Sequence, residues 1–218
     1  MSKERTHIFD MSATRIDYGA LQSTALHRIR AKGVAWAFTP GDFADLGDPR
    51  SVGKVLSRLT TRGVIRRVRR GIYEIPHSHP IAGVVGATTE AIADAIARRD
   101  GLKRFASGAA AANELGLSTQ VSAGRTYGAG PRSRTVKMDD ATKIHFSKRS
   151  GKVLALVGRA SGHLAEALRN LGRDKIGEAD LKSLRSRMNT KDRRQLLEDL
   201  RLVPAWMRPL FKEVARGV

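Results

Sequence analysis

The sequence predicts an α+β fold in two units, residues 1–80 and 81–218. Three helical stretches followed by two short strand-like stretches fill the first unit, whereas the second mixes helices and strands before a helical end. Strands and helices do not alternate regularly, which argues against a doubly wound parallel sheet. With 218 residues and 41% hydrophobic side chains, the chain is long and apolar enough to form packed cores.

The first unit begins with three predicted helices. Apolar residues recur at helical spacing from Tyr18 to Lys32, and Gly33 is a typical residue after a helix end. A short second helix is expected over residues 40–47, with Thr39 as its N-cap and proline at its first position. Asp48 is expected to cap a third helix from Pro49 to about Arg62.

The third helix is predicted to be amphipathic and basic. Its apolar side chains follow an i, i+3, i+4, i+7 pattern at Val52, Val55, Leu56 and Leu59. Basic side chains recur every four residues at Arg50, Lys54, Arg58 and Arg62. These four residues are expected to form a basic ridge along the helix. Like charges at this spacing repel one another, so a bound anion is a natural reason to tolerate them.

Two β-branched stretches, residues 64–68 and 71–75, then predict a hairpin whose turn contains Arg69, Arg70 and Gly71. Three helices followed by a basic hairpin is the element order of a winged helix-turn-helix, a fold that binds double-stranded DNA.

This reading assigns two roles to the basic residues. Side chains of the third helix would contact base edges in the major groove, and those of the hairpin would hold phosphates or reach the minor groove. The predicted DNA contacts are Arg50, Ser51, Lys54, Arg58, Arg62, Arg66, Arg67, Arg69 and Arg70. The alternative is that the ridge is a solvated helix face and that the serine is an idle surface residue.

The second unit is expected to be mixed. Residues 76–80 are predicted to be a proline-bounded connector, and their two histidines are not expected to bind metal because no third ligand has a suitable spacing. The elements expected after it are helices over residues 88–99 and 107–115, strands over 120–127, 134–138 and 143–147, an apolar run over 152–157, a helix over 162–171 and three final helices from residue 177. The final helices are expected to pack on the domain, although terminal amphipathic helices also pair subunits.

A second basic surface is predicted between residues 125 and 152. Period-two strands would bring many of its side chains to one face, where they would contact phosphates or bend DNA. The alternative, a scattered solvated rim, remains open. The residues concerned are Arg125, Arg132, Arg134, Lys137, Lys143, Lys148, Arg149 and Lys152.

Composition narrows the functional classes. A formal charge of +19 favours a polyanionic partner, and the low aromatic content of 5% disfavours RNA or single-strand binding by base stacking. The absence of cysteine excludes disulfides, thiolate metal sites and cysteine nucleophiles. No catalytic constellation or phosphate-binding motif can be assembled, so we expect a protein that is not an enzyme and needs no cofactor or metal. Without a long apolar stretch, a cytoplasmic protein with no membrane partner is expected.

Longer segments carry a resemblance. FTPGDFADLGDPRSVGKVLSRLTTRGVIRRVRRGIYEIP, SGAAAANELGLSTQV, RTYGAGPRSRTVKM and TKIHFSKR resemble the AbiEi-type antitoxin family and its bacterial domain-of-unknown-function relatives, best over residues 20–172. The resemblance implies an N-terminal winged helix-turn-helix that binds inverted repeats in the protein's own promoter and represses the operon. It also implies a C-terminal antitoxin domain and a nucleotidyltransferase-like toxin as genetic partner, neutralised without a stable complex.

One alternative function belongs to a different class. The chain could be a protein-interaction module whose C-terminal domain neutralises a toxin by direct binding, with the basic surface covering an acidic partner. The sequence does not distinguish a dimer from two monomers on a palindromic site.

Overall fold

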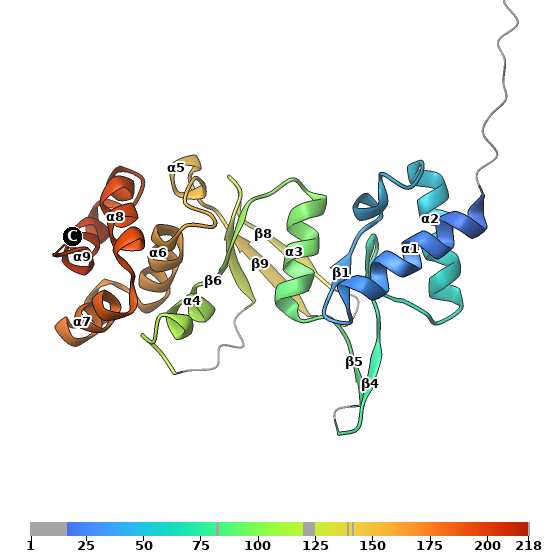
Figure 1. Ribbon diagram of the computed structural model, residues 1–218, viewed down its shortest axis with the longest axis horizontal. Coiled ribbons are helices and arrows are strands. Elements are labelled where there is room, and N and C mark those ends of the chain that lie inside the picture. The colour runs from blue at the N-terminus through green and yellow to red at the C-terminus, as the bar shows by residue number, and fades with distance from the viewer. Residues whose placement is uncertain (1–16, 82, 120–124, 139, 141, 218) are drawn as a thin grey trace, which may run out of the picture.

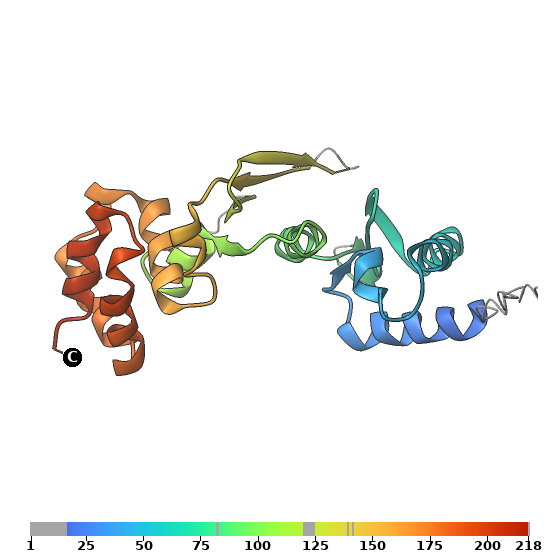
Figure 2. The ribbon, with the colours of Figure 1, turned by 90° about the horizontal axis from the view of Figure 1, so that it is seen from above.

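The computed structural model describes residues 17–81, 83–119, 125–138, 140 and 142–217. These residues form an elongated α+β molecule, with the N-terminal elements at one end of the long axis and the C-terminal helices at the other (Figures 1 and 2). Three main hydrophobic clusters follow one another along the chain. Among the described residues, no helix is long and apolar enough to cross a membrane.

The N-terminal cluster lies between two helices and one edge of a small sheet. Leu21 and Ile29 share this hydrophobic cluster with Val55 and Leu56 and with aromatic side chains of the small sheet. The sheet has the order β1-β3-β2, and both pairings are antiparallel. The elements are α1 (Tyr18–Lys32), β1 (Ala37–Phe38), the 3₁₀ turn η1 (Pro40–Phe43), α2 (Pro49–Thr61), β2 (Arg66–Arg69) and β3 (Ile72–Glu74).

The predicted caps of this unit are confirmed, but the second helix is shorter than expected. The Asp48 carboxylate accepts the backbone N–H groups of Arg50 and Ser51 and starts α2. In place of the helix predicted over residues 40–47, only η1 forms. Its first turn is closed by the Asp42 carboxylate, which accepts the Thr39 N–H at 2.8 Å. The segment before the Asp48 N-cap is short, and a 3₁₀ turn, which needs few residues, is sufficient to connect the preceding strand to the helix that follows.

The predicted connector over residues 76–80 is wrong. His77–His79 forms strand β4, which pairs antiparallel with β5 (Gly83–Val85). This two-stranded β4–β5 arm, residues 77–81 and 83–85, projects away from the body of the molecule (Figure 1). Gly83 has a φ of 69°, a left-handed conformation that glycine adopts without a steric penalty where the chain returns.

Helix α3 (Thr89–Arg99) lies between the two ends of the molecule. Its Ala93 and Ile96 share a hydrophobic cluster with Ala37 and Ile72 of the first sheet and with residues of the next sheet. Arg98 adds polar links, donating to the Ala37 carbonyl at 2.8 Å and to the Asp42 carboxylate. Hydrophobic packing therefore continues across the predicted boundary at residue 80.

The middle sheet has the order β6-β7-β9-β8. Its central pair, β7 and β9, is parallel, and the outer pairs are antiparallel. The strand predicted over residues 120–127 lies partly outside the described residues, and the described strand begins at Thr126. The elements are β6 (Arg104–Ser107), α4 (Gly108–Glu114), β7 (Thr126–Ala129), β8 (Arg134–Lys137) and β9 (Lys143–Ser147).

Helices complete the C-terminal end. Their cluster includes Leu164, Leu168, Leu196 and Phe211, so the final helices pack on the domain as expected. The apolar run at residues 152–157 becomes a short helix. The elements are α5 (Gly151–Leu154), α6 (Ala160–Leu171), η2 (Arg173–Lys175), α7 (Glu178–Arg187), α8 (Thr190–Glu198), η3 (Asp199–Arg201), η4 (Ala205–Met207) and α9 (Arg208–Val214).

Candidate nucleic-acid interface

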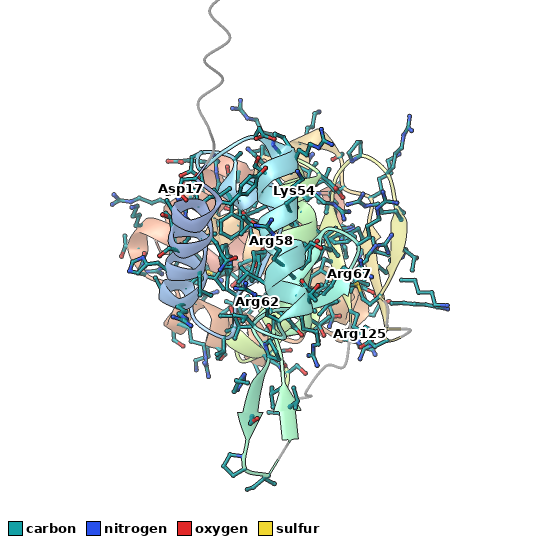
Figure 3. All side chains as sticks on the ribbon, turned by 90° about the vertical axis from the view of Figure 1, so that its right-hand side faces the viewer. Asp17, Lys54, Arg58, Arg62, Arg67 and Arg125 are labelled. Carbon is teal, nitrogen blue, oxygen red and sulfur yellow. The ribbon has the colours of Figure 1, made fainter. Side chains whose placement is uncertain are left out.

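The four residues of the predicted basic ridge, here called the α2 ridge, are exposed: Arg50, Lys54 and Arg58 lie on α2, and Arg62 directly follows its last residue. Lys54, Arg58 and Arg62 follow one another down α2 toward the viewer in Figure 3. The apolar residues predicted to face inward, including Val55 and Leu59, are buried at 1% exposure. Among the described residues, no carboxylate forms an ion pair with any ridge residue, and the arginines of the ion pairs lie elsewhere in the chain. The ridge therefore presents uncompensated positive charge to solvent.

Tyr18 supports the middle of the ridge, a role that the sequence analysis missed. The Lys54 ammonium lies 5.8 Å and the Arg58 guanidinium 5.3 Å from the centre of the Tyr18 ring. The phenolic oxygen is 3.4 Å from the Ser51 hydroxyl, and this hydrogen bond, ahead of the charge of Lys54, lowers the pKa of Tyr18. A tyrosine at the start of α1 that faces the next helix holds both cations on the same side.

Ser51 must be removed from the expected contact set. It is 3% exposed, and its hydroxyl faces Tyr18 instead of solvent. Position 51 lies next to the inward stripe of Val52 and Val55, so the helix turns its side chain toward α1. Its contribution is structural, because it positions the tyrosine beneath the cations.

The hairpin arginines divide into two groups. Arg66 donates to the buried Glu74 carboxylate through Nε at 2.7 Å, and Arg69 donates to the Lys137 carbonyl of β8. Those partners reduce the availability of both side chains for phosphate. Arg67 and Arg70 are exposed and form no ion pair within the described part of the chain.

The second basic surface is smaller than the sequence indicated. Arg149 is 11% exposed and forms a two-point ion pair with the buried Glu166, at 2.7 and 2.6 Å. Arg134 pairs with Asp100 and packs 5.2 Å from the Phe146 ring centre. The prediction that these two arginines are free surface cations is wrong, because each guanidinium is held by a carboxylate that is distant in sequence. The exposed basic residues are Arg125, Arg132, Lys137, Lys143, Lys148 and Lys152.

Exposed basic residues of the second surface lie next to the β2–β3 hairpin. Arg67 and Arg125 line one cleft of about 360 Å³, whose wall includes Ile92 and Ile144. The two arginines are labelled on the face shown in Figure 3. Lys137 and Lys143 are direct cross-strand partners. Like charges in that position are unfavourable, so a nearby anion would relieve them. Basic side chains thus extend from α2 past the β2–β3 hairpin to β8 and β9, with the Asp140 carboxylate in the same cleft as Arg125.

No metal site accompanies this surface in the described ranges. No three histidine, aspartate or glutamate side chains come close enough there to hold an ion. The site offers exposed guanidinium and ammonium donors, which bind phosphate oxygens and guanine edges.

The described residues thus form an α+β protein with a strongly basic surface. Residues 25–196 match the family model described as "Family of unknown function (DUF6088)", and the chain belongs to this family. Neither a curated protein nor a solved structure matches the chain.

Proposed function

We propose that the protein binds double-stranded DNA and that α1, η1, α2 and the β2–β3 hairpin act as a winged helix-turn-helix. The observation that carries this proposal is the α2 ridge, a row of exposed cations on one helix face without carboxylate partners among the described residues. A row of this length matches the phosphate-lined major groove, which admits an α-helix.

The two parts of the surface would have different tasks. Arg50 and Lys54, in the first turns of α2, would donate to base edges and select the sequence. Arg58 and Arg62 lie further along the helix and, with Arg67 and Arg70 of the hairpin, would contact phosphates. Tyr18 would keep Lys54 and Arg58 extended over its ring, which lowers the entropy lost on binding.

We further propose that the protein regulates its own operon and serves as an antitoxin. Occupancy of inverted repeats in the promoter would block transcription, and the C-terminal unit would act against a nucleotidyltransferase-like toxin. Support for the antitoxin role comes from the resemblance of residues 20–172 to AbiEi-type antitoxins. No cofactor enters this mechanism, because contacts to bases and phosphates are sufficient for occupancy.

The DNA-binding proposal is tested by fluorescence anisotropy with a duplex from upstream of the gene and a scrambled duplex. We expect specific binding to the upstream duplex and a roughly hundredfold loss in Lys54→Gln/Arg58→Gln, since each direct contact is worth about 1–3 kcal/mol. The matched control is Lys182→Gln/Lys191→Gln, which removes the same charge from exposed positions on α7 and α8.

Equal weakening by both double variants would contradict a specific site on α2. Equal affinity for both duplexes, lost at moderate salt, would show only nonspecific attraction of a cation for a polyanion.

The antitoxin role is tested by expressing the toxin encoded next to this gene with and without the protein. We expect growth to be restored, and restored equally by Lys54→Gln/Arg58→Gln, because operator binding and toxin neutralisation would use different surfaces. Co-purification of a salt-resistant complex would instead favour neutralisation by direct binding.

A further inference from the structure

The β4–β5 arm exposes apolar side chains to an unusual degree. Ile81, at its tip, is 93% exposed, and Val84 is 63% exposed. From His77 to Val85 the sequence contains no Lys, Arg, Asp or Glu, although 28% of the whole chain is charged. An uncharged projecting hairpin with a bare apolar tip promotes aggregation unless a partner covers it. Exposed apolar side chains on a projecting hairpin are typical of an element that binds a partner.

The position of the arm identifies the kind of partner. Pro76 and Val84, at its base, line a shallow hollow together with Thr60, Arg66 and Arg67. The arm thus starts where α2 ends and where the hairpin arginines lie. In Figure 3 it continues below Arg62, in the same view that shows the ridge facing the reader. A polyanion bound on the ridge would pass next to the arm.

The reach of the arm fits the geometry of a duplex. At about 3.3 Å per residue, the five residue steps from Pro76 to Ile81 extend roughly 16 Å. One turn of DNA is about 34 Å, so neighbouring major and minor grooves are separated by roughly half that distance. With α2 in the major groove, the tip would arrive at the adjoining minor groove.

The chemistry of the tip fits that groove. Proteins that enter the minor groove insert apolar wedges such as isoleucine or proline between base steps and partly unstack them. Pro80 and Ile81 are neighbours at the tip, while the cations that would meet the phosphates, Arg62 and Arg67, lie near the base. An uncharged tip avoids the cost of burying an unpaired charge among the bases.

We propose that the β4–β5 arm inserts Pro80 and Ile81 into the minor groove next to the groove occupied by α2. This inference rests on the proposed DNA binding and adds a second contact, which reads the deformability of a base step instead of hydrogen-bonding groups. Flexible pyrimidine–purine steps would be preferred at that position.

The experiment places 2-aminopurine, which brightens on unstacking, at successive steps of the upstream duplex. We expect the wild type to raise the fluorescence at one step beside the α2 site. Ile81→Ser should abolish that rise and weaken binding roughly tenfold to hundredfold, the loss of one buried aliphatic side chain. The matched control is Leu197→Ser, which alters an exposed apolar residue on α8.

The outcomes separate the two proposals. If wild type and Ile81→Ser bind the duplex equally and neither raises fluorescence at any step, the arm inference is overturned while DNA binding stands. If the wild type does not bind the duplex, both proposals fail. In that case, a change of sedimentation in Ile81→Ser would assign the arm to contact between copies of the chain.

Discussion

Arg67 and Arg149 both come from basic stretches of sequence, but their surroundings differ. Arg67 is exposed beside a cleft that also includes Arg125, whereas Arg149 is enclosed with the Glu166 carboxylate. A charge count cannot separate these cases, because the deciding partner lies 17 residues away in the chain. The predicted exposure was therefore correct for the four residues of the α2 ridge and wrong for Ser51 and Arg149.

Two glycine substitutions should have opposite effects on stability. A Cβ at Gly53, within α2, would meet no atom within 4 Å, whereas one at Gly86 would overlap both carboxylate oxygens of Glu74. We expect Gly53→Ala to stabilise the protein by about 0.5–1 kcal/mol through helix propensity. Gly86→Ala should destabilise it by about 1–3 kcal/mol through overpacking. Urea unfolding measures both, and the same sign for both would contradict the packing described here.

The N-cap of α2 should make stability depend on acid. Hydrogen bonds from Ser51, first through its side chain and then through its backbone, lower the pKa of Asp48. A lowered folded pKa stabilises the fold above the unfolded value, about 3.9, and this contribution is lost as pH falls through the folded pKa. Asp48→Asn, which still caps the helix, should show a shallower loss of stability below about pH 4. Urea unfolding at several pH values measures this loss in both proteins. An equal loss of stability below about pH 4 in wild type and Asp48→Asn would contradict the prediction.

At the scale of elements, local signals predicted most of the N-terminal unit. Asp48 caps α2 as expected, and Gly71, with a φ of 76°, occupies the turn between β2 and β3. These features act over a few residues, so a single sequence contains them. Whether helix, turn and hairpin engage DNA stays a prediction.

The β4–β5 arm shows where local signals fail. Prolines on both sides of His77 to His79 favoured a connector, because proline usually ends a strand. The strand forms because its antiparallel partner, Gly83–Val85, follows only a few residues later in the chain. In the middle sheet, the strands predicted over residues 134–138 and 143–147 are confirmed, but their pairing was not predicted, since the parallel β7–β9 pair depends on contacts across intervening residues.

The contact that joins α6 to the middle sheet should dominate the stability of the C-terminal unit. Glu166 of α6 is 3% exposed and pairs with Arg149, which follows β9. We expect Glu166→Gln to cost about 3–5 kcal/mol, because it leaves a buried guanidinium without its counter-charge. Replacement of both residues, by Arg149→Met/Glu166→Leu, should cost less than the sum of the single losses. Additive losses in urea unfolding would show that the two residues act independently.

At the scale of the whole molecule, the positions of the basic side chains determine the path that a bound duplex would follow, which the net charge alone does not. The Arg69 guanidinium donates to the Lys137 carbonyl, so the hairpin turn of the first sheet is tied to β8. Lys137 faces Lys143 across the strand pair. A duplex that follows α2 and the hairpin would therefore continue over both lysines, and the N-terminal unit and the middle sheet would form one DNA-binding surface.

That continuity predicts a specific change in the salt dependence of DNA binding. Each phosphate neutralised by a cation adds about 0.9 to the slope of log affinity against log salt concentration. Lys137→Ala/Lys143→Ala should therefore lower the magnitude of this slope by about 2 and weaken upstream and scrambled duplexes alike. Lys182→Ala/Lys191→Ala, at the far end of the molecule, should leave it unchanged. An unchanged slope in the first variant would mean that the duplex leaves the protein at the hairpin, since phosphates beyond that point would meet no lysine.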